Sequence, residues 1–229
     1  MKKISILQSN YIPWKGYFDL IAKSDVFVIY DEVQYTKNDW RNRNLISTKD
    51  GLKWLTIPVR QENLTQKIFE SKISSNNWHK KHISSLQGNY SKATCFAEYK
   101  DQIFSLYENQ SDFISEVNTS FIKAICKILD IKTQIIDSRE LNLDGDRNLR
   151  LLEACKKLNA DVYISGPAAK NYLQTDLFKQ EGIDVEWMDY SGYQEYNQLH
   201  EPFAHGVTIL DLIFNTGNDA KEYLKYAED

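Results

Sequence analysis

The sequence predicts an α/β fold with a doubly wound, mostly parallel sheet and a helical insert or cover. Apolar runs such as 26–30 lack the alternation of a half-buried strand, which is typical of strands covered on both faces. Strand-like and helix-like segments alternate four times along the chain. A length of 229 residues lies at the upper end of what one hydrophobic core serves, so we expect one domain, 1–229.

The opening unit reads as strand, helix and strand. Residues 4–7 form the first predicted strand, which runs into the polar turn 8–10. Pro13 suits the first turn of the following helix, and residues 17–21 continue it with an apolar stripe. The run 26–30 is the second predicted strand. A polar turn therefore follows the first strand directly.

A polar and cationic segment, 31–53, comes next and leads into a further predicted strand, 54–59. The proline at position 58 favours a sheet edge or a strand end. Lys49-Asp50-Gly51 has the composition of a hairpin turn. We expect a long polar loop, and with it a candidate binding surface, before this strand.

The middle of the chain predicts helices. From 77 to about 129, apolar residues recur at four-residue spacing, as at Phe113, Val117, Phe121 and Ile125. This region is the predicted helical insert or cover. Beyond it we expect strands at 135–136, 161–165 and 182–187, helices at 148–158 and 168–178, and a helix or edge segment at 208–214 that Gly217 caps.

Composition excludes several classes of protein. A net charge of −4 argues against broad nucleic-acid binding through a basic face. Cys95, Cys126 and Cys155 are isolated, which fits reduced cytosolic thiols in the core better than disulfides or a zinc site. No segment approaches the ~20 apolar residues of a membrane span, and no signal-peptide cleavage site follows the N-terminus. The sequence predicts a cytoplasmic protein without a membrane partner.

Ligands of open parallel sheets bind beyond the carboxyl ends of the strands. That rule selects three loops, 8–14, 31–44 and 165–170. The second is the densest polar stretch: Arg41 and Arg43 are suited to clamp phosphates or carboxylates, and Trp40 to stack on a sugar or base. The alternative is a solvated loop whose asparagines stabilise local turns.

Acidic, amide and hydroxyl groups complete these loops. Asp31 and Glu32 follow a strand directly, where a general base or a ribose-binding carboxylate is often found. Asn10 precedes a helix start that lacks dinucleotide and P-loop patterns, and Trp14 is more typical of core. Ser165, before Gly166, is placed to cap a helix or to contact a phosphate.

Two further features suggest chemistry. His79 and His82 are three residues apart, so one could transfer protons, although the alternative is an exposed helix face and a third zinc ligand is missing. Asp211 is a carboxylate inside an apolar run, and we expect it to pair with an arginine such as Arg41, Arg43 or Arg150.

An ordered set of motifs is similar to the signature of the WbqC-like protein family. The motifs are 8–18, 31–34, 40–44, 54–59, Trp78 with Lys81-His82, 163–166, 172–173, 182–183 and 209–217. They span essentially the whole chain, and such an ordered set is far more specific than any single motif. Ser9, where the family often has proline, and Thr216 are small departures.

The resemblance implies a role in bacterial O-antigen or other surface-polysaccharide biosynthesis, where nucleotide-linked amino sugars are commonly decorated. The first hypothesis is transfer of an acyl or aminoacyl group to the amine of such a sugar. Arg41 and Arg43 would clamp the diphosphate, and His82 or Asp31 would act as the base. The sugar and base contacts would come from Asn10, Trp14, Gln34, Asn42 and Asn44, with Ser165 and Gly166 assisting.

Two alternatives stay open. One is a nucleotidyl-transferase or adenylate-forming ligase-like enzyme, whose opening unit is loosely similar but whose paired-histidine motif is absent. The other is a non-catalytic partner in polysaccharide assembly, which predicts an exposed apolar patch without a converging polar cleft. The substrate partner is a nucleotide-linked sugar; the sequence identifies no cofactor or metal site and leaves the acyl donor and the oligomeric state, a homo-oligomer included, undefined.

Overall fold

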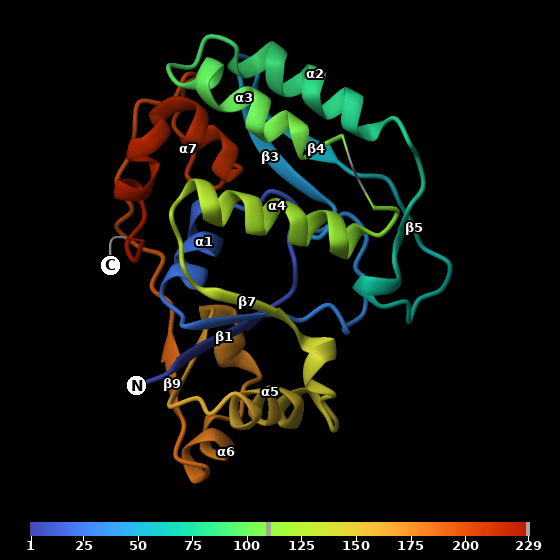
Figure 1. Cartoon of the computed structure of the whole chain (residues 1–229), viewed down its shortest axis with the longest axis vertical. Helices are drawn as coiled ribbons and strands as arrows, with labels where there is room; N and C mark the ends of the chain where they lie inside the picture. Colours follow the sequence, from blue (N-terminus) through green and yellow to red (C-terminus); the bar gives the residue numbers. More distant parts are fainter. Residues whose placement is uncertain (109–110, 228–229) are drawn as a thin grey trace.

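A five-stranded parallel sheet forms the centre of the protein, as the computed structural model shows for residues 1–108 and 111–227 (Figure 1). Its order is β7-β2-β1-β8-β9. The strands are β1 (Lys3–Leu7), β2 (Val26–Ile29), β7 (Gln134–Asp137), β8 (Val162–Ser165) and β9 (Asp184–Trp187). The chain winds outward from β1 to β7 and then crosses to β8 and β9 on the other side. The doubly wound α/β fold is therefore confirmed, and this central sheet is entirely parallel.

Helices cover both faces of the sheet (Figure 1). On one side lie α1 (Lys15–Ala22), α4 (Ile114–Ile128) and α7 (Ile209–Thr216), and on the other α5 (Arg147–Lys157) and α6 (Thr175–Gln180). The side chains of β2 alternate between the two cores: Phe27 joins the first, and Val28 joins the second. Burial on both faces explains why this strand is apolar throughout.

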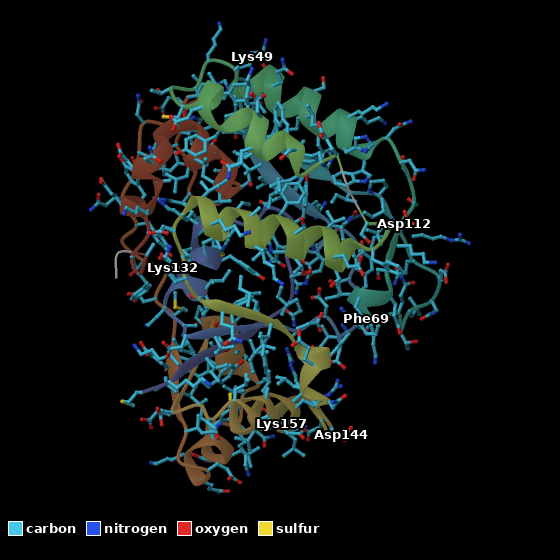
Figure 2. The ribbon with its side chains drawn as sticks, in the orientation of Figure 1. Lys49, Phe69, Asp112, Lys132, Asp144 and Lys157 are labelled. Atoms are coloured by element: carbon cyan, nitrogen blue, oxygen red, sulfur yellow. The ribbon has the colours of Figure 1, made fainter. Side chains whose placement is uncertain are left out.

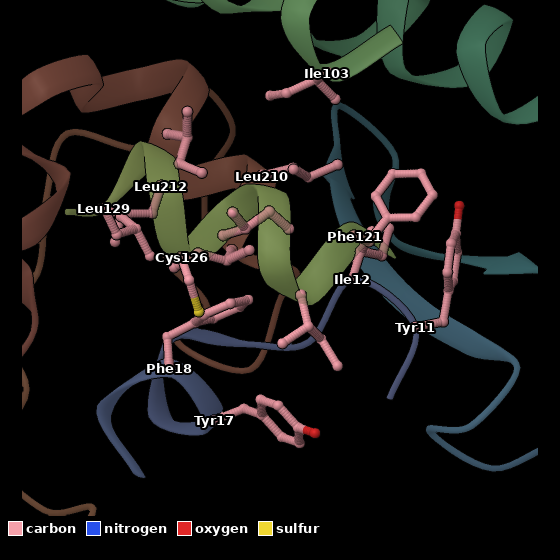
Figure 3. Close-up of a cluster of buried hydrophobic side chains, with 14 of the residues drawn as sticks. Tyr11, Ile12, Tyr17, Phe18, Ile103, Phe121, Cys126, Leu129, Leu210 and Leu212 are labelled. Atoms are coloured by element: carbon pink, nitrogen blue, oxygen red, sulfur yellow. The ribbon is translucent and has the colours of Figure 1, made fainter. Parts of the chain in front are cut away.

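The first core is built largely of aromatic and branched side chains. In Figure 3, Phe121 and Cys126 of α4 lie opposite Tyr11 and Phe18, and all four side chains are buried. The Phe121 ring meets that of Tyr11 edge-on, with 5.8 Å between centroids. The apolar residues whose four-residue spacing predicted this helix thus form the face of α4 that packs into the first core.

The region predicted to be helical contains α2 (Trp78–Tyr90), α3 (Phe96–Ser105) and α4, so the prediction of helices there is confirmed. Helices α2 and α3 lie farther from the central sheet than α4, near a hairpin formed by β3 (Arg43–Thr48) and β4 (Gly51–Thr56) (Figure 1). Their buried side chains belong to the same cluster as those of α1 and α7. Among the described residues, no helix is both long enough and apolar enough to cross a bilayer.

The segment between β2 and α2 is more structured than the sequence predicted. β3 (Arg43–Thr48) and β4 (Gly51–Thr56) form an antiparallel hairpin, and the predicted turn at 49–51 is confirmed. The polar loop ends earlier than predicted, because Arg43 and Asn44 already lie on β3. The predicted strand 54–59 is confirmed at 54–56, within β4, but its continuity is wrong: it breaks before Pro58, and β5 (Val59–Arg60) pairs separately with β6 (Lys72–Ile73). Proline lacks the N–H that a continuous ladder needs.

The predicted helix 168–178 is also divided, into the 3₁₀ segment η3 (Pro167–Asn171) and α6. At the break, the Asn148 side chain bonds the carbonyl oxygen of Tyr172 and the backbone N–H of Gln174. It supplies partners that a continuous helix would supply itself. The last predicted segment is the helix α7, which ends at Gly217 with φ of 59°. The remaining 3₁₀ segments are η1 (Ile68–Glu70), η2 (Ser138–Leu141) and η4 (Gly217–Tyr223).

Candidate functional site

A cleft of about 820 Å³ opens at the carboxyl ends of β1 and β8, where the chain direction across the sheet reverses. Open α/β sheets bind ligands at this switch point, and the volume falls within the ~300–1,000 Å³ typical of ligand pockets. Phe69 and Asp144, labelled in Figure 2, lie on the side of the molecule where these strands end. All three loops selected from the sequence contribute lining residues, among them Gln8, Glu32, Gln34, Arg41, Ser165 and Gly166.

Arg41 is half-buried in this cleft and is held in place by two side-chain amides. Its Nη1 donates to Asn10 Oδ1 at 2.9 Å, and its Nη2 donates to Gln8 Oε1 at 3.1 Å. Asp39 lies 3.8 Å from Nη1. Because amide oxygens are neutral, the guanidinium keeps most of its positive charge for an incoming anion.

Helix α5 contributes two more guanidinium groups. Arg147, at the first position of the helix, lies over the ring of Tyr172 with its Cζ 3.4 Å from the centroid. Arg150 donates to the Leu143 carbonyl at 3.2 and 3.1 Å and lies 3.6 Å from Glu32. Three arginines from two elements therefore line one cleft, which favours a ligand with several negative charges.

Two carboxylates lie among these arginines. Glu32 accepts a hydrogen bond from Ser138 Oγ at 2.7 Å. Burial tends to raise the pKa of Asp39, but the hydrogen bond from Thr36 and the charge of Arg41 outweigh it and hold that pKa below its usual range. Asp39 is therefore ionised at neutral pH. The cleft offers acceptors for hydroxyl or ammonium groups as well as cations for anions.

Ser165 and Gly166 lie at the end of β8. The N-terminal cap of η3 is Gly166, so the prediction that Ser165 caps this segment is wrong. Ser165 is buried at the cleft wall, and its carbonyl accepts from Met188 N at 2.9 Å. The carboxyl end of β8 thus presents small groups to the cleft, opposite the larger side chains of the loop after β2.

A second pocket, of about 340 Å³, adjoins the residues that hold Arg41. Its lining consists of Asn10, Pro13, Trp14, Trp40, Asn44 and Gly206. The structure therefore divides the predicted binding set: Gln34, Arg41, Ser165 and Gly166 line the cleft, and Asn10, Trp14 and Asn44 line this pocket. The hydrogen bond from Arg41 to Asn10 joins the two cavities.

Asn42 and Arg43 line neither cavity in the described part of the chain. Asn42 is buried and donates to the Ile57 carbonyl at 2.9 Å, which secures the start of the hairpin. The Arg43 guanidinium lies over the Trp54 ring, with its Cζ 4.1 Å from the centroid. Arg147, which the sequence analysis did not select, supplies the cleft with a guanidinium in place of Arg43.

Asp31 is enclosed rather than open to the cleft. Only 2% of its surface is exposed, and it accepts hydrogen bonds from Ser9 N at 2.8 Å, Ser9 Oγ at 2.7 Å and Ser115 Oγ. Burial raises its pKa, although these hydrogen bonds counteract the rise. The contacts tie the loops after β1 and β2 to α4. They give Asp31 a structural role, and a catalytic role for it stays a prediction.

His82 is buried in α2, so an exposed helix face is excluded. Its Nε2 lies 3.2 Å from the Thr56 carbonyl, and its Nδ1 lies 2.8 Å from the Tyr11 hydroxyl, which bonds Tyr107. Burial lowers its pKa to about 4, so the ring is neutral at pH 7. A carbonyl only accepts, so Nε2 carries the proton and Nδ1 accepts from Tyr11. Its catalytic role stays a prediction, because the ring lines neither cavity.

Asp211 does not pair with an arginine, and that expectation is wrong. Its carboxylate accepts from the hydroxyls of Tyr90 and Tyr196 and from Gln198 Nε2, each at 2.7 Å. Hydroxyl and amide donors satisfy a buried carboxylate without the desolvation of a second charge. Within the described residues, no group of three or more His, Cys, Asp or Glu side chains is arranged to hold a metal ion.

The model of the WbqC-like protein family matches residues 8–223, which include all the lining residues of the second pocket and all those of the cleft except Ile6 and Leu7. The chain belongs to the WbqC-like protein family. It is 46% identical over 228 residues to the uncharacterized protein Rv1507c of Mycobacterium tuberculosis, with 99% of each chain covered. No solved structure matches the chain.

Within this WbqC-like chain, the contribution of α5 to the cleft was not predicted from the sequence. Arg147 was not selected, and Arg150 was considered only as a partner of Asp211. Residues 138–146 follow β7 of the parallel sheet and lead into α5, so the rule that selected three other loops applies equally to this connection. The predicted strand at 135–136 already placed a fourth strand end before α5.

Proposed function

We propose that this WbqC-like protein binds a nucleotide-linked amino sugar in the cleft and transfers an acyl or aminoacyl group to its amine. The observation that carries the proposal is the convergence of Arg41, from the loop after β2, and Arg147, from the start of α5, at the β1–β8 switch point. Two guanidinium groups that approach from different elements suit a diphosphate, which carries its charge on several oxygens.

Glu32 extends this assignment to the ribose. It lies three residues after β2, in a sheet of order β7-β2-β1-β8-β9, and a carboxylate there is suited to accept hydrogen bonds from ribose hydroxyls. The Tyr172 ring under Arg147 adds an aromatic surface at the same wall. Together these groups match the three parts of a nucleoside diphosphate: base, ribose and phosphates.

The proposed reaction joins an amine to an activated acyl donor, such as a thioester. The ammonium first gives one proton to a base, the amine nitrogen then bonds the acyl carbon, and the bond from that carbon to the sulfur breaks. A second proton passes from the nitrogen to the departing thiolate, which leaves as a free thiol. Asp39 is ionised, lines the cleft and lies 3.8 Å from Arg41 Nη1, so it is suited to orient that guanidinium toward the diphosphate. The unpaired Cys95, Cys126 and Cys155 suit the reducing cytoplasm in which we place this reaction.

The strand order also suits a second candidate, nucleotidyl transfer. Such an enzyme would use the same switch-point cleft for a nucleoside triphosphate and a sugar phosphate, and it would release pyrophosphate. Incubating the protein with each nucleoside triphosphate, magnesium and a hexose 1-phosphate distinguishes the two candidates. Pyrophosphate release with formation of a nucleotide sugar would favour nucleotidyl transfer over acyl transfer.

The binding proposal is tested by calorimetry with UDP, dTDP and GDP and with amino-sugar conjugates of UDP and dTDP. We expect one nucleotide to bind, and Arg147→Ala to weaken it roughly 10- to 100-fold, the range for hydrogen bonds to charged groups. Arg60→Ala is the matched control, because Arg60 is exposed and lies outside the cleft lining. Equal losses in both variants, or no binding by the wild type, would reject the proposed site.

The transfer step is tested by mass spectrometry. The protein is incubated with the bound amino-sugar nucleotide and a panel of acyl and aminoacyl thioesters, and the product is expected to carry the added mass of one acyl group. Arg147→Ala should lower this turnover at subsaturating nucleotide sugar, and Arg60→Ala should not. Binding without turnover for any donor would support a non-catalytic sugar-nucleotide binder instead.

A further inference from the structure

We infer that the second pocket, lined by Asn10, Pro13, Trp14, Trp40, Asn44 and Gly206, holds the pyranose ring of the nucleotide-linked amino sugar. This inference rests on the proposed function, because it assigns the sugar moiety of the same ligand. The pocket is separate from the cleft that would take the nucleotide. Its lining residues are different from those of the cleft, so the sugar and the nucleotide would each have their own subsite.

The chemistry of the lining differs sharply from that of the cleft. No described lining residue of the second pocket is charged, whereas three arginines and two carboxylates line the cleft. Indole rings offer apolar faces to the C–H groups of a pyranose, and side-chain amides pair with its hydroxyls. An indole face also attracts an ammonium group, which favours an amino sugar. Phosphates find no cation here.

The two cavities meet where the diphosphate of a bound nucleotide sugar would give way to the sugar ring. Arg41 lines the cleft and donates to Asn10, which lines the second pocket. The adjacent Trp40 contributes its ring to the pocket, with 42% of its surface exposed. A diphosphate held by Arg41 would therefore place the linked sugar next to Asn10 and Trp40. This order matches that of nucleoside, diphosphate and sugar in the ligand.

The pocket is held in shape before any ligand binds. The rings of Tyr190 and Tyr193 pack against Trp14, with centroids 5.2 and 5.9 Å away. A β-carbon on Gly16 would lie only 2.4 Å from the Trp14 ring, so the absence of a side chain at Gly16 makes room for the indole. Trp14 is therefore fixed by close contacts, and a rigid stacking surface loses little entropy on binding.

Backbone strain in the turn beside the second pocket also supports a ligand site there. Ile12 has φ of 35°, a conformation that is rare and costly for a β-branched residue. Its carbonyl accepts from Asn44 Nδ2 at 2.9 Å and from Thr208 Oγ1 at 2.7 Å. Two segments thus hold the turn between Asn10 and Trp14 in a strained form, and such strain concentrates at ligand sites.

The test compares each ligand with and without its sugar. The full chain is titrated calorimetrically with UDP and UDP-glucosamine, and with dTDP and dTDP-4-amino-4,6-dideoxyglucose. For the preferred base, we expect the sugar to increase affinity, and Trp40→Ala to weaken the sugar conjugate roughly fivefold to tenfold, as for loss of an aromatic contact, while changing affinity for the bare nucleotide less than about twofold. Trp40→Phe, which keeps an aromatic face, should restore most of the loss.

Leu52→Ala is the matched control, because Leu52 is also exposed, at 51%, but lines neither cavity. Trp54 is unsuitable because its ring packs against Trp40, with 5.4 Å between the centroids. We expect Leu52→Ala to keep the advantage of the sugar conjugate. If the bare nucleotide binds and Trp40→Ala weakens it as much as the conjugate, or if Leu52→Ala has the same effect as Trp40→Ala, the sugar subsite is rejected while the nucleotide cleft stands. If the wild type binds no nucleotide and no conjugate, both proposals fail.

Discussion

Two polar regions built from the loops after β1 and β2 differ in how completely their groups are paired. In the region around Asp31, serine donors enclose the carboxylate, and Asn118 bonds Ser9 in turn. In the cleft beside it, Arg41 is held only by neutral amide oxygens and a more distant carboxylate. Polar residues close in sequence can therefore serve opposite purposes: the first region stabilises the loops, and the second is available to a ligand.

The largest expected effect is a loss of stability when the acceptor at the centre of the region around Asp31 is removed. Asp31→Ala leaves the donors of Ser9 and Ser115 without their acceptor in a buried site, and we expect a loss of about 3–5 kcal/mol in the free energy of unfolding. Thermal unfolding should begin roughly 10 °C lower. Asp31→Asn, which keeps the shape, should cost less than half as much. A variant Asp31→Ala with wild-type stability and no turnover would instead assign catalysis to Asp31.

His82 gives the next largest effect, which appears as a dependence of stability on pH. Its folded pKa of about 4 lies below the usual 6.5, so protonation favours the unfolded chain. The contribution is present above pH 6.5 and is lost as the pH falls toward 4, with a total of about 3 kcal/mol. Unfolding by urea at pH 7 and pH 4.5 measures this, and His82→Gln should reduce the difference.

His79→Gln is the control for this measurement, since His79 lies one turn away on the same helix. It should leave the dependence on pH close to that of the wild type. If His82→Gln instead kept the stability profile and abolished turnover, the ring would have a chemical role that its buried contacts do not suggest. The experiment therefore distinguishes a structural role of the buried His82 ring from a catalytic role. His82 is, with Asp31, one of the two residues predicted from the sequence to act as the base.

The fold was predictable because its signals are local. The apolar run 26–30 and the four-residue spacing of 113–129 each depend on one strand or helix, and both were confirmed. The end of the polar loop was not, because Arg43 and Asn44 look like loop residues and become strand residues only by pairing with Thr56 and Leu55. Pairing partners distant along the chain are not encoded in local composition.

The position of the candidate site was also predictable, but the burial of its members was not. The strand-end rule located the loops that line the cleft, since it depends only on the order of strands and helices. Asp31 and Glu32 are adjacent, yet the first is enclosed by α4 and the second lines the cleft. Only the packing of α4, which begins far along the chain at Ile114, decides between them. No pattern within 31–44 carries that information.

A moderate effect on ligand affinity is expected from a substitution of Glu32, which lines the cleft. Glu32→Gln removes the charge that would accept hydrogen bonds from ribose hydroxyls, so affinity for the ribonucleotide should fall roughly tenfold. Affinity for the 2′-deoxy form should change much less, so the preference for ribose would disappear. Calorimetry with UDP and dUDP measures this. Equal losses for both sugars would mean that Glu32 acts only by holding Arg150.

The smallest expected effect tests whether the shape of the second pocket matters for binding independently of the stability of the protein. Gly16→Ala introduces a β-carbon 2.4 Å from the Trp14 ring, which Tyr190 and Tyr193 keep from retreating freely. Alanine favours the helix by up to ~1 kcal/mol over glycine, which offsets part of the clash, so the melting temperature should change little. Displacement of Trp14 should still weaken the sugar conjugate roughly threefold to fivefold, about 1 kcal/mol, and leave the bare nucleotide unaffected.

Gly88→Ala provides the matched variant, since Gly88 also lies within a helix but a β-carbon there would have no atom within 4 Å among its described neighbours. It should stabilise α2 by up to ~1 kcal/mol and leave both affinities unchanged. If Gly16→Ala behaved like Gly88→Ala in stability and in binding, the fixed position of Trp14 would be irrelevant to the ligand. A loss confined to the sugar conjugate would show that the second pocket depends on a Trp14 ring that is fixed before the ligand binds.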